Sequence, residues 1–342
     1  MMPGLYGEGS YDMPDASWKK DTSSVMRYAV LSDVHGNCPA LKKVLADADR
    51  RGIGNFIIAG DYALSGAWPD ECIQVLLDLP DKLIIRGNEE RYLEDLIGKD
   101  QSKWTDGQMQ ISYWCYRNIA PEHLSYVLGL PVTDQCGING VKISMAHSSD
   151  AFIGEYEFGR FGPAILAERY NGSEVTKERL GSDIKEILDN DPLFAERVND
   201  LEDGVYIFGH SHVQWSYKVN GRNIWLINPG SCGLPLDGIR DSIPYSVLTI
   251  ASDGEISLEE VRIPFDKKAY AEELMKTMQY KEANVWSKVI IHELLTAREH
   301  LTFFLQFADR YADGIGDPVR PFTVNTWEAA YEAWESSLRE LE

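Results

Sequence analysis

The sequence lacks paired cysteines and long apolar runs, which are features of several large classes of protein. Its five cysteines form no C-x-x-C pair, and an odd, dispersed set indicates reduced thiols in a reducing compartment. No stretch is apolar over the roughly 20 residues that are needed to cross a bilayer. Residues 1–25 have no apolar core of the kind found in a signal peptide. We therefore expect a cytoplasmic protein that has no membrane partner.

Positive charge is also scarce. The chain has 33 Lys and Arg residues against 54 Asp and Glu residues, which gives a net charge of -21. Such a surface repels the phosphate backbone of nucleic acids, so a nuclease or a general nucleic-acid binder is disfavoured. A local basic pocket could still capture a single phosphate group. The rest of the composition, 44% hydrophobic in 342 residues, is that of a globular protein with a substantial core.

Strands and helices alternate in the first part of the chain. Apolar runs near 28–31, 55–59 and 82–86 are each followed by a segment that predicts a helix. This βαβαβ rhythm predicts parallel strands that are joined by right-handed crossovers, and thus an α/β fold. Further strands are expected at 131–135, 141–146 and 205–208, and turn signals at 219–222 and 252–254 predict two hairpins in a second sheet.

Changes in composition divide the chain into three parts. Residues 1–25 are rich in Gly, Ser, Asp and Pro, and we expect a disordered tail. Residues 26–265 form the predicted main domain. An insertion over about 150–200 separates two ligand-bearing strand ends, so we expect it to lie over the site as a partial lid. Residues 266–342 form a helical C-terminal extension.

The C-terminal extension is rich in aromatic residues. One helix is expected over 283–308 and another from Asn325 or Thr326, with Glu328 placed as in a capping box. The aromatic faces of these helices are expected to pack on the main domain or on a second copy of the chain. A homo-oligomer through the C-terminal helices is therefore one expected partner arrangement.

Five apolar runs are each closed by a short polar motif. The motifs are Asp33-Val34-His35, Gly60-Asp61, Gly87-Asn88, His147 and Gly209-His210-Ser211-His212. Chemistry in α/β folds gathers beyond the carboxyl ends of such strands. Four of the seven histidines lie in these motifs together with carboxylates and one amide, a mixture of N and O donors that borderline divalent metals favour. The sequence therefore predicts a dinuclear metal site.

Each motif is weak evidence by itself, and other histidines offer less. Two histidines at i and i+2 directly after an apolar strand make Gly209-His210-Ser211-His212 the strongest motif. His292-Glu293-Leu294-Leu295-Thr296 begins like a zincin helix, but Thr296 replaces the second histidine that such a site needs. We expect His123, His292 and His300 to be surface or packing residues. It is the order and the strand-end placement of all five motifs together that point to a metal site.

The motifs and their order resemble those of the calcineurin-like metallophosphoesterase superfamily, in particular its branch of small bacterial and archaeal predicted phosphodiesterases. The resemblance covers about residues 26–270. The matching signatures are Asp33-Val34-His35-Gly36-Asn37, Gly60-Asp61, Arg86-Gly87-Asn88-Glu89-Glu90, Ala146-His147-Ser148, Gly209-His210-Ser211-His212 and Asn228-Pro229-Gly230-Ser231. The last of these is expected to form a tight turn that supports the site.

The resemblance implies a fold and a set of metal ligands. The expected fold is a four-layer α-β-β-α sandwich with two metal ions at the strand ends. Carried over by position, the first metal would be held by Asp33, His35, Asp61 and His212. The second would be held by Asp61, Asn88, His147 and His210, so that Asp61 bridges both. Manganese or iron is the expected occupant, with zinc, cobalt or nickel as alternatives.

The resemblance also implies an activity. It is hydrolysis of phosphodiesters or phosphomonoesters of small molecules by in-line attack of a metal-bridging hydroxide, with Asp61, Asn88 and His147 taking part in catalysis. An alternative is a non-catalytic module of the same fold that binds other proteins. Because the sequence keeps all seven ligand positions, the enzyme is the favoured hypothesis.

One position departs from the family pattern. Many members have His directly after the Asn of the third motif, where it is thought to protonate the leaving oxygen, but this chain has Glu89. We expect a solvent-exposed, ionised Glu89, which would be a poor acid. The alternative is that Glu89 is buried and protonated and is itself the proton donor.

Overall fold

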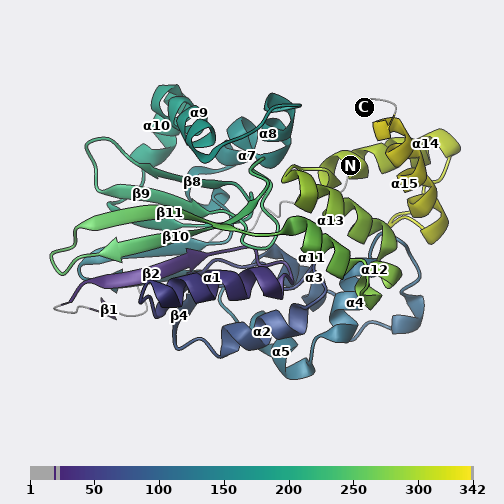
Figure 1. Ribbon diagram of the computed structural model, residues 1–342, viewed down its shortest axis with the longest axis horizontal. Coiled ribbons are helices and arrows are strands. Elements are labelled where there is room, and N and C mark those ends of the chain that lie inside the picture. The colour runs from purple at the N-terminus through teal and green to yellow at the C-terminus, as the bar shows by residue number, and fades with distance from the viewer. Residues whose placement is uncertain (1–18, 21–23, 340–342) are drawn as a thin grey trace.

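The computed structural model describes residues 19–20 and 24–339. Two sheets lie in the middle of the molecule with helices on either side (Figure 1). One sheet has the strand order β11-β10-β2-β3-β4, and the other has the order β1-β5-β6-β7-β9-β8. The strands are β1 Lys19–Lys20, β2 Met26–Leu31, β3 Asn55–Ile58, β4 Asp81–Ile84, β5 Thr133–Ile138, β6 Val141–Ala146, β7 Gly204–Ile207, β8 Gln214–Lys218, β9 Ile224–Pro229, β10 Ser242–Ile250 and β11 Ile256–Pro264.

The predicted βαβαβ unit forms the centre of the five-stranded sheet. Strands β2, β3 and β4 pair in parallel, and helices α1 and α2 connect them. Helix α1 begins where the sequence predicts, because the Asn37 side chain accepts the N–H of Ala40 and Pro39 lies in the first turn. The helices of this half are α1 Cys38–Arg50, α2 Pro69–Leu77, α3 Asn88–Glu94, α4 Gln110–Asn118 and α5 Pro121–Leu128.

Three apolar cores separate four layers. Along β2, Ala29 and Leu31 pack toward α1 and α2, whereas Val30 packs against the other sheet, as the period of two in a strand requires. The outer face of the six-stranded sheet has its own core, in which Phe208 packs with Leu180 of the insertion. The α-β-β-α sandwich that the resemblance implies is therefore confirmed.

The insertion is a set of short helices. They are α6 Asp150–Ile153, α7 Tyr156–Phe161, α8 Pro163–Arg169, α9 Lys177–Asn190 and α10 Pro192–Asn199. Helices α9 and α10 lie over the outer side of the six-stranded sheet, and α7 and α8 extend toward the C-terminal helices (Figure 1). One part of the insertion thus completes a layer of the sandwich and the other part approaches the strand ends.

The C-terminal helices gather beyond one end of the sheets (Figure 1). They are α11 Lys267–Leu274, α12 Met278–Glu282, α13 Asn284–Thr296, α14 Leu301–Ile315 and α15 Val324–Arg339. The predicted single helix over 283–308 is wrong, because the chain breaks at Ala297, whose φ of 54° is left-handed. Glu293 accepts the N–H groups of His300 and Leu301 beyond the break. Helices α13, α14 and α15 share an apolar cluster that is centred on Phe304 and Trp327, whereas Tyr270 of α11 packs into the core of the main domain.

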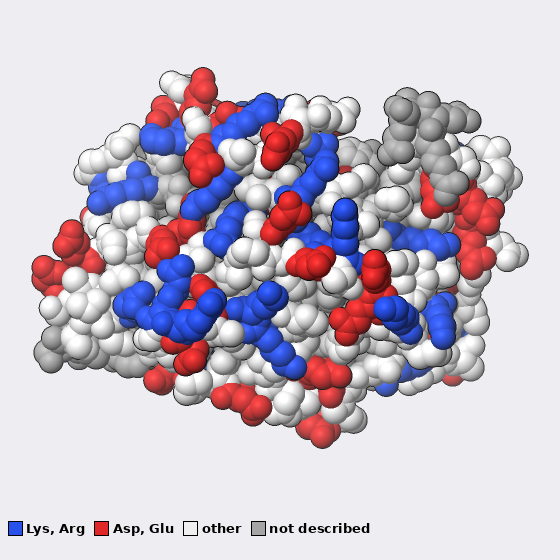
Figure 2. Space-filling view, viewed as in Figure 1, with Lys and Arg blue, Asp and Glu red and all other residues white. Residues whose placement is uncertain are grey.

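The described residues bear on several other predictions. The predicted disordered tail lies mostly outside them, although Lys19–Lys20 pairs in parallel with β5 as strand β1. All five cysteines are free and buried. No described helix is both long enough and apolar enough to cross a bilayer. On the face of the molecule that Figure 2 shows, acidic and basic side chains are interspersed.

Candidate metal centre

The predicted ligands lie on loops at the carboxyl ends of parallel strands. Asp33 follows β2, Asp61 follows β3, His147 follows β6 and His210 follows β7, each within three residues of the strand. The loop after β2 is hydrogen-bonded to the loop after β3, with the N–H of Val34 2.8 Å from the Asp61 carbonyl oxygen. The two sheets therefore deliver their polar motifs to one place.

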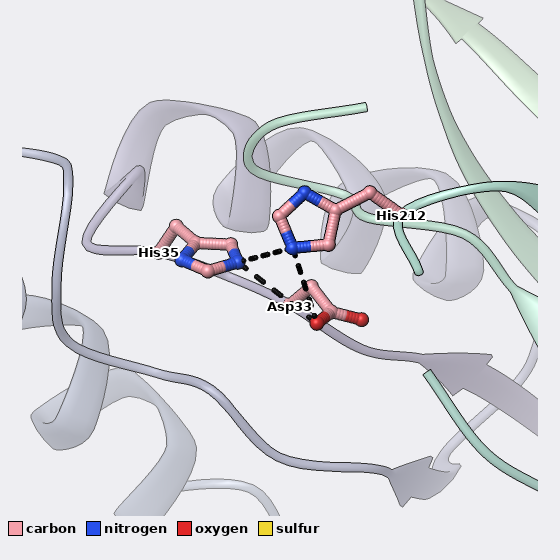
Figure 3. A group of neighbouring side chains, drawn as sticks. All are labelled: Asp33, His35 and His212. Carbon is pink, nitrogen blue, oxygen red and sulfur yellow. Dashed lines mark hydrogen bonds and ion pairs between the residues drawn. The ribbon is translucent and has the colours of Figure 1, made fainter. Parts of the chain in front are cut away.

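The first ligand group consists of Asp33, His35 and His212, whose donor atoms all lie within 4.8 Å of one another. Both imidazole rings converge above the Asp33 carboxylate (Figure 3). The Nε2 atoms of His35 and His212 are 2.8 Å apart, and His212 Nε2 is 3.5 Å from Asp33 Oδ1. This is the spacing of ligands that surround one cation.

The second ligand group consists of Asp61, His147 and His210. His147 Nε2 lies 3.0 Å from Asp61 Oδ2, and the rings of His147 and His210 lie 5.0 Å apart between centroids. The two groups adjoin, because Asp61 also lies in a set with His35 and Glu89. The backbone N–H of His210 contacts both carboxylate oxygens of Asp33 at 3.1 Å, which orients that side chain.

The orientation of these side chains fits bound metal ions. His147 Nδ1 contacts the Ala59 carbonyl oxygen at 2.6 Å and His212 Nδ1 contacts that of Leu234 at 2.8 Å. Each Nδ1 therefore carries its proton, and each Nε2 presents a lone pair to the centre. Asn88 Oδ1 is buried and accepts no hydrogen bond from the residues that the structure describes. A cation is the partner that such convergent lone pairs suit.

Burial and neighbouring charge shift the pKa values of the donors in different directions. Burial lowers the pKa of His210 to about 3 and that of His212 well below its usual range, so that both rings are neutral. Burial alone would raise the pKa of Asp61, but His147 and His35 outweigh burial and hold it well below its usual value. Burial raises the pKa of Asp33 to about 6. Burial would lower the pKa of His35 and of His147, but Glu89 raises that of His35 to about 9 and Asp61 raises that of His147 to about 10. Because neutral imidazole and carboxylate are the ligating forms, metal binding at these two histidines would release protons.

Five of the seven predicted ligands have a left-handed backbone. Their φ angles are 54° at Asp33, 50° at His35, 57° at Asp61, 68° at His210 and 59° at His212. Residues other than glycine adopt this conformation at a cost of about 1–3 kcal/mol each, and it concentrates at functional sites. At each of these residues the left-handed conformation reverses the chain direction and points the side chain over the strand ends. The backbone conformation therefore sets the geometry of the site.

Two glycines make room for the ligands. A Cβ atom at Gly87 would overlap the carboxylate of Asp61, and one at Gly209 would overlap Ser32 and the carboxylate of Asp33. Each glycine directly precedes a predicted ligand, Asn88 or His210. The Gly in the Gly-Asn and Gly-His motifs is therefore required by the close approach of the neighbouring loop.

Glu90 ties two ligand loops together. Its fully buried carboxylate accepts the N–H groups of Tyr62 and Gly87 at 2.7 Å and that of Asp61 at 3.2 Å. Burial, followed by the charge of Asp61, raises its pKa to about 7. Its place in the first turn of α3, three residues after Gly87, is the sequence signal for this role.

The expectation of a solvent-exposed Glu89 is wrong. The first turn of α3 packs against the loop after β3, so only 14% of the Glu89 side chain is exposed. Its Oε2 lies 3.0 Å from Nδ1 of His35 and accepts the N–H of Leu64 at 3.2 Å. Burial raises the pKa of this carboxyl group.

Sequence reasoning missed Glu157 of α7. This fully buried carboxylate accepts hydrogen bonds from Ser211 Oγ, from Trp215 Nε1 at 2.7 Å and from Asn228 Nδ2 at 3.1 Å. Asn228 also donates to the Gly209 carbonyl oxygen at 2.9 Å, so it supports the site. Asn228 and Pro229 are the last residues of β9, so the predicted tight turn does not begin at Asn228. Glu157 thereby anchors the insertion to the loop that carries His210 and His212. No motif surrounds it in the sequence.

The metal centre opens into a cleft of about 220 Å³. His35, Asp61, Asn88, His210 and His212 form its inner end, and α13, α14 and the insertion contribute walls. Phe158 of α7 lies over the ring of His210 at 5.1 Å between centroids. The part of the insertion that reaches the site is therefore α7 and α8.

The three histidines that were expected to be surface or packing residues lie outside the centre. His123 contacts Asp70 at 2.7 Å. His292 and His300 pack their rings against Trp334.

Comparison with known proteins gives concordant results. Residues 26–253 match the model of the calcineurin-like phosphoesterase superfamily domain. An uncharacterized protein of Methanocaldococcus jannaschii is 28% identical over 259 residues, which cover 71% of this chain and 89% of that protein. A metallophosphoesterase from Sphaerobacter thermophilus has a similar fold, with a TM-score of 0.51, 20% identity and coverage of 80% of this chain and 99% of that one. A hypothetical protein from Pyrococcus horikoshii aligns with a TM-score of 0.50 and 15% identity, over 80% of this chain and 100% of that one. The chain belongs to the calcineurin-like phosphoesterase superfamily.

Proposed function

We propose that this protein is a metal-dependent phosphoesterase that binds two metal ions and hydrolyses phosphodiesters or phosphomonoesters of small molecules. The observation that carries the proposal is the position of Asp61. This carboxylate groups with His147 and His210 on one side and with His35 on the other. Two cations that are bound close together need shared negative charge, and a bridging carboxylate supplies it.

The seven predicted ligands divide between two metal ions. Asp33, His35, Asp61 and His212 would hold the first, and Asp61, Asn88, His147 and His210 the second. Their N and O donors suit manganese or iron, with zinc, cobalt or nickel as alternatives. A bound pair of such ions would lower the pKa of a coordinated water to near neutrality and offset the negative charge on a phosphoryl group.

The protein's own residues position these parts. Asp61 is fixed from two sides, since Oδ1 accepts the N–H of Glu89 at 2.9 Å and Oδ2 faces His147. Asn88 presents its unpaired Oδ1 at the inner end of the cleft. We assign Asp61, Asn88 and His147 to catalysis, because Asp61 and Asn88 line the inner end of the cleft and His147 Nε2 lies 3.0 Å from Asp61 Oδ2.

The alternative of a non-catalytic module predicts a different outcome. Such a module would bind a partner protein without turning over phosphate esters. The complete ligand set and the cleft that leads to it favour the enzyme. The cytoplasmic location and the homo-oligomer through the C-terminal helices stay predictions.

The test is hydrolysis of bis-p-nitrophenyl phosphate and p-nitrophenyl phosphate by the full chain, loaded in turn with each of the five metals. We expect turnover that depends on the metal, and loss of both turnover and bound metal in Asp61→Asn. Asp49→Asn, on the exposed face of α1, is the matched control and should behave like the wild type. Full metal content and activity in Asp61→Asn would overturn the assignment.

A further inference from the structure

The cleft beside the metal centre is apolar beyond its inner end. Trp286 and Ile290 of α13 and Leu301 and Leu305 of α14 line one side, and Leu234 and Phe158 line others. Ile290 is 4% exposed and forms the packed base of this wall, whereas Trp286, Leu301 and Leu305 are partly exposed. An apolar group that binds against such a surface is stabilised, because the contact removes apolar area of both from water.

The wall comes from a part of the chain outside the family match. The match ends at residue 253, whereas α13 begins at Asn284 and α14 ends at Ile315. The metal ligands all lie within the matched residues, which therefore carry the shared chemistry. Helices α13 and α14 instead form one wall of the cleft beside the metal centre.

The ionisable groups of the outer cleft are acidic. Apart from the metal centre and Glu89, the ionisable residues that line it are Glu293 and Glu299. Both already serve the start of α14, where Glu293 accepts the N–H groups of His300 and Leu301, and Glu299 accepts that of Thr302. The described residues that line the cleft include no Lys or Arg, so a chain of phosphates would find no cationic side chain here, whereas an apolar group would meet complementary surface.

We propose that the substrate is an ester of a single phosphate group whose organic part is apolar and occupies the cleft lined by α13 and α14. This inference rests on the proposed function and names the substrate class of that site. The phosphate lies at the inner end, among the metal ligands, and the apolar group extends along Ile290 and Leu305. Each methylene that is buried there strengthens binding by up to roughly fourfold.

The experiment is a series of p-nitrophenyl phosphodiesters in which the second ester group is methyl, butyl, hexyl or phenyl. The leaving group is constant, so kcat/KM reports the fit of the second group. We expect kcat/KM to rise at least tenfold from methyl to hexyl, and to be high for phenyl. An equal or higher value for the methyl ester overturns the inference, although hydrolysis itself would uphold the proposed function.

Variants in α14 test whether the preference for the hexyl ester arises from contact with Leu305. Leu305→Asp should lower kcat/KM for the hexyl ester much more than for the methyl ester, and so remove the preference for the hexyl ester. Gln306→Asp introduces the same charge on the exposed side of the same helix and should keep the preference. Leu305→Ala, which is less disruptive, should reduce the preference by severalfold. A wild-type preference in both Leu305 variants would refute the placement of the apolar group.

A binding experiment tests the proposed role of the cleft independently of the proposed hydrolysis. Hexylphosphonate and methylphosphonate are not hydrolysed, and their dissociation constants for the metal-loaded chain can be compared by calorimetry. We expect hexylphosphonate to bind at least tenfold more tightly. If no ester is hydrolysed but this ratio holds, the cleft is correct and the proposed activity is wrong. Equal binding of the two phosphonates overturns the inference.

Discussion

Glu89 lies behind His35, with its Oε2 atom 3.0 Å from His35 Nδ1. The other nitrogen of the same ring faces His212 Nε2 at 2.8 Å. A carboxylate in this position fixes the tautomer and the orientation of a ligating histidine and increases its basicity. Glu89 is thus placed to position His35, a role that an exposed side chain could not fill.

Removal of the Glu89 carboxylate should weaken the binding of metal. Glu89→Ala frees the His35 ring, and loss of such an outer partner typically lowers metal affinity by about 10–100-fold. We expect excess metal to restore most of the activity, and Glu89→Gln to fall between Ala and wild type because its oxygen can still accept from Nδ1. Metal titration monitored by calorimetry and by turnover gives both numbers. Glu94→Ala, farther along α3, is the control and should bind metal normally.

A leaving-group series tests the other role of Glu89. If Glu89 only positions His35, rates on aryl and alkyl phosphates should fall in parallel in Glu89→Ala at saturating metal. A variant that keeps full metal affinity but loses about 10²–10⁴-fold selectively on alkyl esters would identify Glu89 as the proton donor instead.

Metal removal should destabilise the protein as well as inactivate it. Without a cation, the lone pairs of His35 Nε2 and His212 Nε2 face one another at 2.8 Å unless a proton lies between them. A ligand present at 100 times its dissociation constant stabilises the folded state by about 2.7 kcal/mol. We expect treatment with a chelator to lower the melting temperature, and added metal to restore it. A melting temperature that does not change with metal would contradict a site built from these residues.

The stability of the protein should fall with rising pH because of Glu157. Burial raises its pKa from 4.5 to about 7, so the folded state holds this proton more tightly than the unfolded state. The stabilisation is complete below pH 4.5 and is lost as the pH rises through about 7. A shift of about 2.5 units corresponds to about 3 kcal/mol. Urea unfolding at pH 4.5 and pH 8 should show this difference between wild type and Glu157→Gln, whose amide oxygen keeps the three donors. Parallel pH profiles would rule it out.

Two Gly→Ala substitutions should have opposite effects. Gly87→Ala places a Cβ against the carboxylate of Asp61 and should reduce both metal content and stability. Gly181→Ala, on the exposed face of α9, meets no atom within 4 Å and should stabilise the protein by about 0.5–1 kcal/mol. Chemical unfolding and elemental analysis of both variants give the comparison. A neutral Gly87→Ala would show that the two loops are less tightly packed than the structure describes.

The sandwich and the meeting of the ligand motifs were predictable, because both depend on local patterns. The run that ends at Leu31 and the motif that begins at Asp33 together specify a buried strand and a polar strand end. The two hairpins followed from turn residues at 219–222 and 252–254, and they connect β8 to β9 and β10 to β11. The placement of both in a second sheet was wrong, because β10 pairs with β2 and so belongs to the five-stranded sheet. Parallel strands then deliver their ends to one edge.

What the sequence did not predict depends on contacts between distant segments. The burial of Glu89 comes from packing of α3 on the loop after β3, and the role of Glu157 comes from contact with Ser211, far away in the chain. The break at Ala297 was hidden because the apolar pattern continues across it. Glu293 stabilises that break by accepting two N–H groups beyond it.

The chain keeps its ligands and the side of its cleft that α13 and α14 form in separate stretches of sequence. The last predicted ligand is His212, and the helices that present Ile290 and Leu305 begin at Asn284. Substitutions in the second stretch can therefore accumulate without disturbing the first, so selectivity and reactivity are free to evolve independently. An engineer could exploit this by grafting different terminal helices onto the same catalytic framework.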